Sequence, residues 1–175
     1  MDLRQFTLGL LVTSFAAAAG FASGPQVSPL ALTPEAEVAS TLDAFHAAAA
    51  RADEAAYFDL IAPGGVFLGT DASERWEKEA FRAFARPYFS QGKGWTFVPR
   101  DRHVALTGGG TIAWFDELLD SASYGECRGT GVLERVHGRW RILQYHLTIP
   151  VPNDLAKEIV ARIREHAAPP ADAPR

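Results

Sequence analysis

Four side chains that can transfer protons or bind an anion occupy matching positions in four consecutive segments. They are Arg102, Asp116, Arg128 and His146. Each segment alternates apolar and polar residues, which is typical of half-buried β-strands. Three-residue loops at 108–110, 121–123 and 136–138 would join these strands as antiparallel hairpins. In that register the four side chains lie opposite one another and share one face of a sheet.

The predicted row has the composition of an acid–base or anion-binding site. Neighbouring strands lie about 4.8 Å apart, so two arginines would keep Asp116 ionised, and a neutral His146 could accept a proton. We therefore predict Asp116, His146 and Arg128 as candidate catalytic residues. Arg102 is predicted to line the same pocket.

The rows beside these residues mix apolar and polar side chains, which is the usual composition of a small-molecule pocket. The further pocket-lining candidates are Trp114, Thr130, Gln144 and Ile142, with Trp76 and Tyr57 from the preceding region. An alternative stays open, because charged rows are common on the solvent-facing side of antiparallel sheets. A register shift of one residue would also move a strand's side chains to the opposite face.

Helices are expected before these strands, which predicts an α+β arrangement. Thr33 and Pro34 are typical of a helix start, and Val38, Leu42 and Phe45 form an apolar stripe along that helix. The expected helices are 34–51, 54–60, 73–89 and a terminal helix to about 166. The expected strands are 66–69, 95–106, 111–120, 124–136 and 139–149.

Composition excludes several classes of protein. The chain has 175 residues, with 17 Lys and Arg against 21 Asp and Glu, so it lacks the positive surplus that nucleic-acid binding needs. Cys127 is the one cysteine, which excludes an internal disulfide and a Cys-rich metal site. The five histidines lack the His-Glu-x-x-His spacing of a zinc site. We therefore predict no cofactor and no metal.

The N-terminal residues are typical of a secretory signal. Arg4 precedes an apolar run over 6–19, and the small residues Gly20 and Ala22 provide a cleavage point after Ala22. We expect a signal peptide over 1–22, a linker over 23–32, a domain over 33–166 and a flexible tail over 167–175. The mature protein is expected to be periplasmic or secreted, without stable membrane insertion. An uncleaved membrane anchor is the alternative.

Two motifs resemble the SnoaL-like branch of the nuclear transport factor 2 superfamily. One is Phe67-Leu68-Gly69-Thr70-Asp71 with Trp76, and the other is Gly138-x-Trp140-x-Ile142-x-x-x-His146-x-Thr148. The resemblance covers about residues 34–166. It implies a cone-shaped α+β barrel, in which a curved antiparallel meander wraps over the N-terminal helices and encloses a cavity.

The resemblance also implies two classes of function. Similar proteins include non-catalytic binding domains, and also isomerases, cyclases, dehydratases and hydrolases that use acid–base chemistry without a cofactor. We therefore expect an exported protein that binds a small, partly apolar molecule, with a cofactor-free enzyme as the alternative. Similar proteins also pair through the outer sheet face, which implies a homodimer. The residues expected at that contact are Phe115, Leu143, Tyr145 and Leu147.

Overall fold

The computed structural model describes residues 32–167. The predicted signal peptide, nearly all of the predicted linker and nearly all of the predicted tail lie outside these residues. The described helices are α1 (Pro34–Ala50), α2 (Glu54–Asp59), α3 (Lys78–Phe89) and α4 (Ala156–Ala167). The described strands are β1 (Ile61–Leu68), β2 (Arg75–Glu77), β3 (Val98–Leu106), β4 (Ile112–Ser121), β5 (Gly125–Val136) and β6 (Arg139–Thr148).

The six strands form one mixed sheet in the order β2-β1-β6-β5-β4-β3. Strands β3 to β6 form the predicted antiparallel meander. The pairing of β1 with β6 is parallel, which the sequence analysis did not predict. The sheet is open within residues 32–167, because β2 and β3 form its two edges. The predicted α+β class is confirmed.

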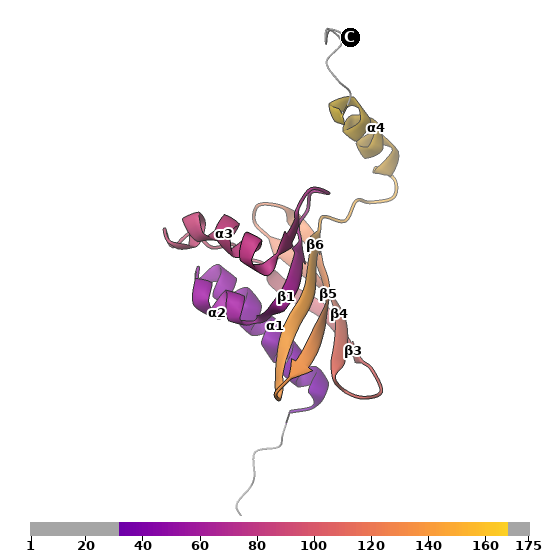
Figure 1. Ribbon diagram of the computed structural model, residues 1–175. Helices are drawn as coiled ribbons and strands as arrows, with labels where there is room; N and C mark the ends of the chain where they lie inside the picture. Colours follow the sequence, from indigo (N-terminus) through magenta and orange to yellow (C-terminus); the bar gives the residue numbers. More distant parts are fainter. Residues whose placement is uncertain (1–31, 168–175) are drawn as a thin grey trace, which may run out of the picture. The chain divides into compact units, whose positions relative to one another are not determined.

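Helices α1, α2 and α3 cover one face of the sheet, as Figure 1 shows. The apolar stripe of α1 faces the sheet, and Val38, Leu42 and Phe45 are buried in the core with Phe115 and Tyr145 of the sheet. Burying such side chains is the main favourable contribution to folding. We call this covered side the inner face and the other side the outer face.

Local signals at the start of α1 agree with the sequence analysis. The Thr33 side chain accepts a hydrogen bond of 3.2 Å from the backbone N–H of Ala36. Pro34 occupies the first turn, where a backbone N–H has no partner within the helix, so its lack of an N–H costs no hydrogen bond. Glu35 and Glu37 lie in the same turn and complement the positive end of the helix dipole.

Strand β2 replaces the first turn of the predicted helix at 73–89. A tight connection follows β1, in which the Gly69 N–H donates to the Glu74 carbonyl at 2.9 Å. The chain therefore reverses, and Trp76 pairs with Phe67 as a short antiparallel strand. Helix α3 begins only at Lys78.

Two local irregularities shift the predicted strand register. Asp101 has a φ of 48° and interrupts β3, because the pairing shifts between Arg100 and His103. The second irregularity is in β6, where Leu143 is an extra residue between Ile142 and Gln144. Each extra residue reverses which face the next side chains occupy.

The last hairpin also differs from the prediction. His137 and Gly138 form a two-residue loop with φ values of 49° and 76°, and Val136 pairs directly with Arg139. We expected a three-residue loop because positive φ is unfavourable for histidine. The two-residue turn instead matches the right-handed twist of the flanking strands, and histidine is among the side chains that tolerate this conformation best.

Candidate functional site

The predicted row of Arg102, Asp116, Arg128 and His146 does not form. Asp116 lies opposite Thr130, which lies opposite His146. Arg128 lies two positions further along, opposite Leu118 and Thr148. The middle hairpin turns one residue later than predicted, at 122–124, which shifts the pairing of β4 with β5 by two residues and moves Arg128 away from Asp116.

Asp116, Arg128 and His146 share a face, but it is the outer face. Their neighbours Phe115, Glu117 and Leu119 are buried beneath the helices, and alternate side chains of a strand point to opposite sides. The Asp116 side chain is 59% exposed, and its Oδ2 lies 3.2 Å from Nδ1 of His103. The predicted placement of these candidates in a sheltered pocket is therefore wrong.

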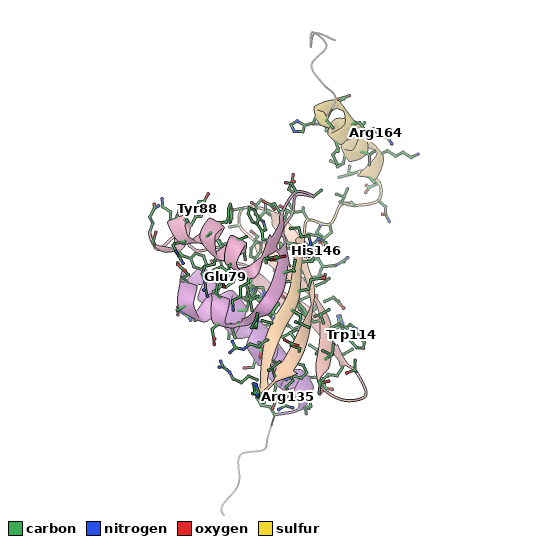
Figure 2. All side chains as sticks on the ribbon, in the orientation of Figure 1. Glu79, Tyr88, Trp114, Arg135, His146 and Arg164 are labelled. Carbon is green, nitrogen blue, oxygen red and sulfur yellow. The ribbon has the colours of Figure 1, made fainter. Side chains whose placement is uncertain are left out.

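Most of the predicted pocket-lining residues also lie away from any inner cavity. Trp114, Thr130 and Gln144 occupy the outer face with Asp116, and Figure 2 shows Trp114 on the side of the sheet away from the helices. Ile142 and Tyr57 are buried in the core. The expected dimer contact is corrected too, because Phe115, Tyr145 and Leu147 are buried on the inner face.

Arg102 is displaced to the inner face by the irregularity at Asp101. There its Nε donates to Glu117 Oε2 at 2.7 Å, and its guanidinium also donates to Asp43 at 2.8 Å and to the Ala39 carbonyl at 3.0 Å. The sequence analysis predicted Arg102 but not its partner Glu117, because the bulge that turns Arg102 to the face of Glu117 does not show in the periodicity of β3.

Glu117 is the centre of a buried polar network. Its side chain has no exposed surface, and its Oε1 contacts His46 Nε2 at 2.7 Å and accepts a hydrogen bond from Tyr145 Oη at 3.1 Å. Together with Arg102, these contacts satisfy both carboxylate oxygens, as a buried charge requires. The network therefore joins α1 to three strands of the sheet.

A glycine makes room for this network. Gly129 lies on β5 between Glu117 of β4 and Leu147 of β6. A methyl group at Gly129 would overlap the Tyr145 hydroxyl and approach Glu117 Oε1 within 3.0 Å. The Tyr145 side chain can reach Glu117 only because position 129 has no side chain.

Opposing effects set the ionisation of Glu117. Burial alone would raise its pKa, but the hydrogen bonds and charges of His46 and Arg102 outweigh burial and hold the pKa below its usual value. Burial and the neighbouring Glu117 charge raise the pKa of Tyr145 well above the ordinary value. Glu117 is therefore an ionised acceptor, and Tyr145 is a neutral donor.

This pKa predicts a loss of stability in acid. Because the pKa of Glu117 is lower in the folded than in the unfolded chain, ionised Glu117 stabilises the fold above about pH 4.3. That contribution disappears as the pH falls from there through the folded pKa. Urea denaturation between pH 7 and pH 3 should show a smaller loss for Glu117→Gln than for the native chain. Equal losses in the two proteins would contradict the prediction.

The cavity of interest lies beside this network, between α3 and the sheet, and has a volume of about 240 Å³. Eight of the twelve described residues that line it are aromatic. They are Phe67, Trp76, Phe81, Phe84, Tyr88, Trp95, Phe97 and Tyr124. Of the candidates predicted from the sequence, Trp76 alone lies on this wall. We call this the aromatic cavity.

Stacked rings build the wall of the aromatic cavity. Phe67 stacks on Phe81 with centroids 4.2 Å apart, and Trp76 stacks on Phe84 at 5.0 Å. Phe84, Tyr88 and Tyr124 are each between 42% and 53% exposed, so the cavity opens to solvent between them. Such an apolar hollow is shaped to hold a small molecule.

The polar groups of the aromatic cavity come from the connection between β1 and β2. Gly69, Thr70 and Glu74 line it there, and the Asp71 N–H donates to Glu74 Oε2 at 3.2 Å. Among the described lining residues, Glu74 has the only charged side chain. The sequence did contain a signal for this wall, because Phe81, Phe84 and Tyr88 recur at helical spacing on one side of α3. Such a stripe more often packs into a core than lines a cavity.

A SnoaL-like domain is recognised over residues 38–152 of the sequence. The chain belongs to the SnoaL-like domain family. The match includes α1 from Val38 onward, all six strands and the residues that line the aromatic cavity. No functionally curated protein matches this SnoaL-like chain.

Solved structures share the fold of this SnoaL-like protein at low sequence identity. An NTF2-like protein of unknown function from Pseudomonas putida superposes with a TM-score of 0.57 at 17% identity, over 69% of this chain and 89% of that one. A candidate dehydratase of the NTF2-like family from Streptomyces avermitilis gives 0.54 at 18%, over 67% and 96%. A candidate ketosteroid isomerase from Parabacteroides distasonis gives 0.53 at 20%, over 66% and 86%.

Within residues 32–167, no group of three or more His, Cys, Asp or Glu side chains is arranged to hold a metal ion. None of the helices in this range is long and apolar enough to cross a membrane.

Proposed function

We propose that this protein is an exported SnoaL-like protein that binds a small, largely apolar molecule in the aromatic cavity. The observation that carries the proposal is the wall of eight aromatic side chains around about 240 Å³ of open space. Pockets for drug-sized ligands occupy about 300–1,000 Å³, so the ligand is small. Aromatic walls hold such ligands by stacking and by burial of apolar surface.

The buried network does not serve as the binding site in this proposal. Glu117, His46 and Arg102 are not among the residues that line the aromatic cavity, and Glu117 already has partners on both oxygens. We assign the network a structural role, because it joins α1 to the sheet. Ligand recognition is therefore assigned to the cavity wall.

Benzyl alcohol tests the proposal, because it is small, neutral and aromatic. Trp76→Ala is expected to weaken its binding about tenfold, since one stacking surface is lost. Isothermal titration calorimetry measures the dissociation constant. Trp114→Ala is the matched control, because Trp114 lies on the outer face and is 49% exposed, and its affinity should equal that of the native protein. Equal losses in both variants, or no binding to the native protein, would refute the proposal.

A second function, cofactor-free acid–base catalysis, is favoured by the position of Glu74. A carboxylate on the wall of an apolar cavity can act as a general base, whereas Asp116 and His146 lie on the outer face. Deuterium exchange at the methyl group of acetophenone, followed by NMR in D₂O, tests this function. Exchange that stays at the solvent rate in the presence of the protein would exclude Glu74 as a base for this ketone.

Export and self-association are proposals from the sequence alone. Export rests on the apolar run over 6–19 and the small residues before position 23. N-terminal sequencing of the mature protein would place the cleavage point, and a full-length mature chain would contradict cleavage. Sedimentation equilibrium would show whether the protein is a homodimer.

A further inference from the structure

We infer that the ligand of the aromatic cavity is an organic ammonium ion, whose charged nitrogen lies against Glu74 and whose apolar part lies among the aromatic rings. This inference rests on the proposed function and adds the charge of the ligand to it.

The charge on the wall of the aromatic cavity favours a positively charged ligand. Glu74 has the only charged side chain among the described residues that line the aromatic cavity, and none of those residues is Lys, Arg or His. A ligand carboxylate or phosphate would therefore meet a like charge with no positive partner. An ammonium ion would meet an opposite charge in partly apolar surroundings, where such a pair is stronger than in water.

The aromatic rings of the cavity wall also favour a positively charged ligand. The faces of tryptophan, tyrosine and phenylalanine carry partial negative charge and attract cations. Trp76 lies two residues beyond Glu74 and stacks on Phe84 with centroids 5.0 Å apart, and Phe84 in turn contacts Tyr88 at 5.7 Å. Aromatic rings and a carboxylate therefore line the same cavity, and both favour a positive ligand.

The connection between β1 and β2 holds the Glu74 side chain in place. Its carboxylate accepts a hydrogen bond from the Asp71 N–H at 3.2 Å, and its carbonyl accepts one from the Gly69 N–H at 2.9 Å. Gly69 also packs directly against the Glu74 side chain, so that a methyl group at position 69 would overlap it. The carboxylate is therefore partly oriented before a ligand binds, which lowers the entropy lost on binding.

The test compares benzylamine, which is a benzylammonium ion at pH 7, with benzyl alcohol, which has nearly the same size and shape and is neutral. Isothermal titration calorimetry at low ionic strength is expected to show benzylammonium binding at least about tenfold more tightly to the native protein. Glu74→Gln should abolish this preference, so that the two probes bind that variant with about equal affinity. Glu74→Lys should exclude benzylammonium while benzyl alcohol still binds.

Glu79→Gln is the matched control. Glu79 lies at the start of α3 with its side chain 73% exposed, it does not line the aromatic cavity, and Figure 2 shows it on the same helix as Tyr88. This variant changes the net charge as Glu74→Gln does, so it should keep the native preference. Thermal denaturation of each variant confirms that it is folded before it is titrated.

The outcomes separate this inference from the proposed function. If both probes bind the native protein equally, or if Glu74→Gln keeps the preference for benzylammonium, the inference is overturned while ligand binding by the cavity stands. If neither probe binds, the proposed function and the inference fail together. If Glu79→Gln loses the preference as Glu74→Gln does, the effect is long-range charge and not recognition by Glu74.

Discussion

Replacing Glu117 with leucine is expected to lower the free energy of unfolding by about 3–5 kcal/mol. The substitution removes a buried acceptor from His46, Arg102 and Tyr145 at once. The largest cost comes from Arg102, because its side chain is only 12% exposed and would keep its charge without its buried partner. Urea denaturation with linear extrapolation measures the change.

Two further variants identify the source of that loss. Adding Arg102→Met to Glu117→Leu should recover most of the stability, because it removes a guanidinium that has lost its buried carboxylate and keeps only the exposed Asp43 as an ionic partner, and it leaves two apolar side chains in contact. Glu126→Leu should change stability by less than about 1 kcal/mol, since Glu126 and its partner Arg100 are an exposed pair. A double variant no more stable than Glu117→Leu would show that the Arg102 guanidinium, left without Glu117, is not the cause.

Replacing Phe45 with alanine is expected to lower the free energy of unfolding by about 3–5 kcal/mol. Phe45 is 2% exposed, stacks on Tyr57 with centroids 4.3 Å apart and packs against Tyr145 at 5.1 Å. One ring therefore connects α1 with α2 and with the centre of the sheet. Its removal leaves a cavity that these rigid neighbours cannot fill.

Phe84→Ala is the matched control for this substitution. Phe84 is 42% exposed at the mouth of the aromatic cavity, so less apolar surface returns to water and no closed void forms. Its stability should fall by a small fraction of the Phe45→Ala loss. Comparable losses from the two variants would mean that the Phe45 cluster is not the centre of the core.

Elements with strong local signals were predictable from the sequence. Thr33 and Pro34 mark the start of α1, and period-two alternation marks the four strands of the meander, whose observed ends lie within about three residues of those expected. The short strand β2 was missed because residues 75–77 continue a helical pattern. The parallel pairing of β1 with β6 was missed because it joins distant parts of the chain, and no local spacing encodes it.

The candidate site was harder to predict, because one extra residue in a strand moves the side chains that follow it to the opposite face of the sheet. Asp101 and Leu143 each add one residue to a strand, and those two residues decide that Arg102 and Ile142 face inward while Gln144 and His146 face outward. Asp101 forms its bulge with a positive φ, and the residues around it give no sign of this conformation. The aromatic cavity was missed for another reason, since an aromatic stripe that lines a hollow has the same spacing as one that fills a core.

The parallel pairing of β1 with β6 also determines when the sheet can be completed during synthesis of the chain. Val66 pairs with Gln144, so nearly eighty intervening residues must leave the ribosome before β1 acquires β6 as its second neighbour. Until then, the apolar sides of the early helices have no completed sheet to cover them. Such distant pairings slow folding and prolong exposure of apolar surface, so a nascent chain of this protein should depend on chaperones until β6 is synthesised.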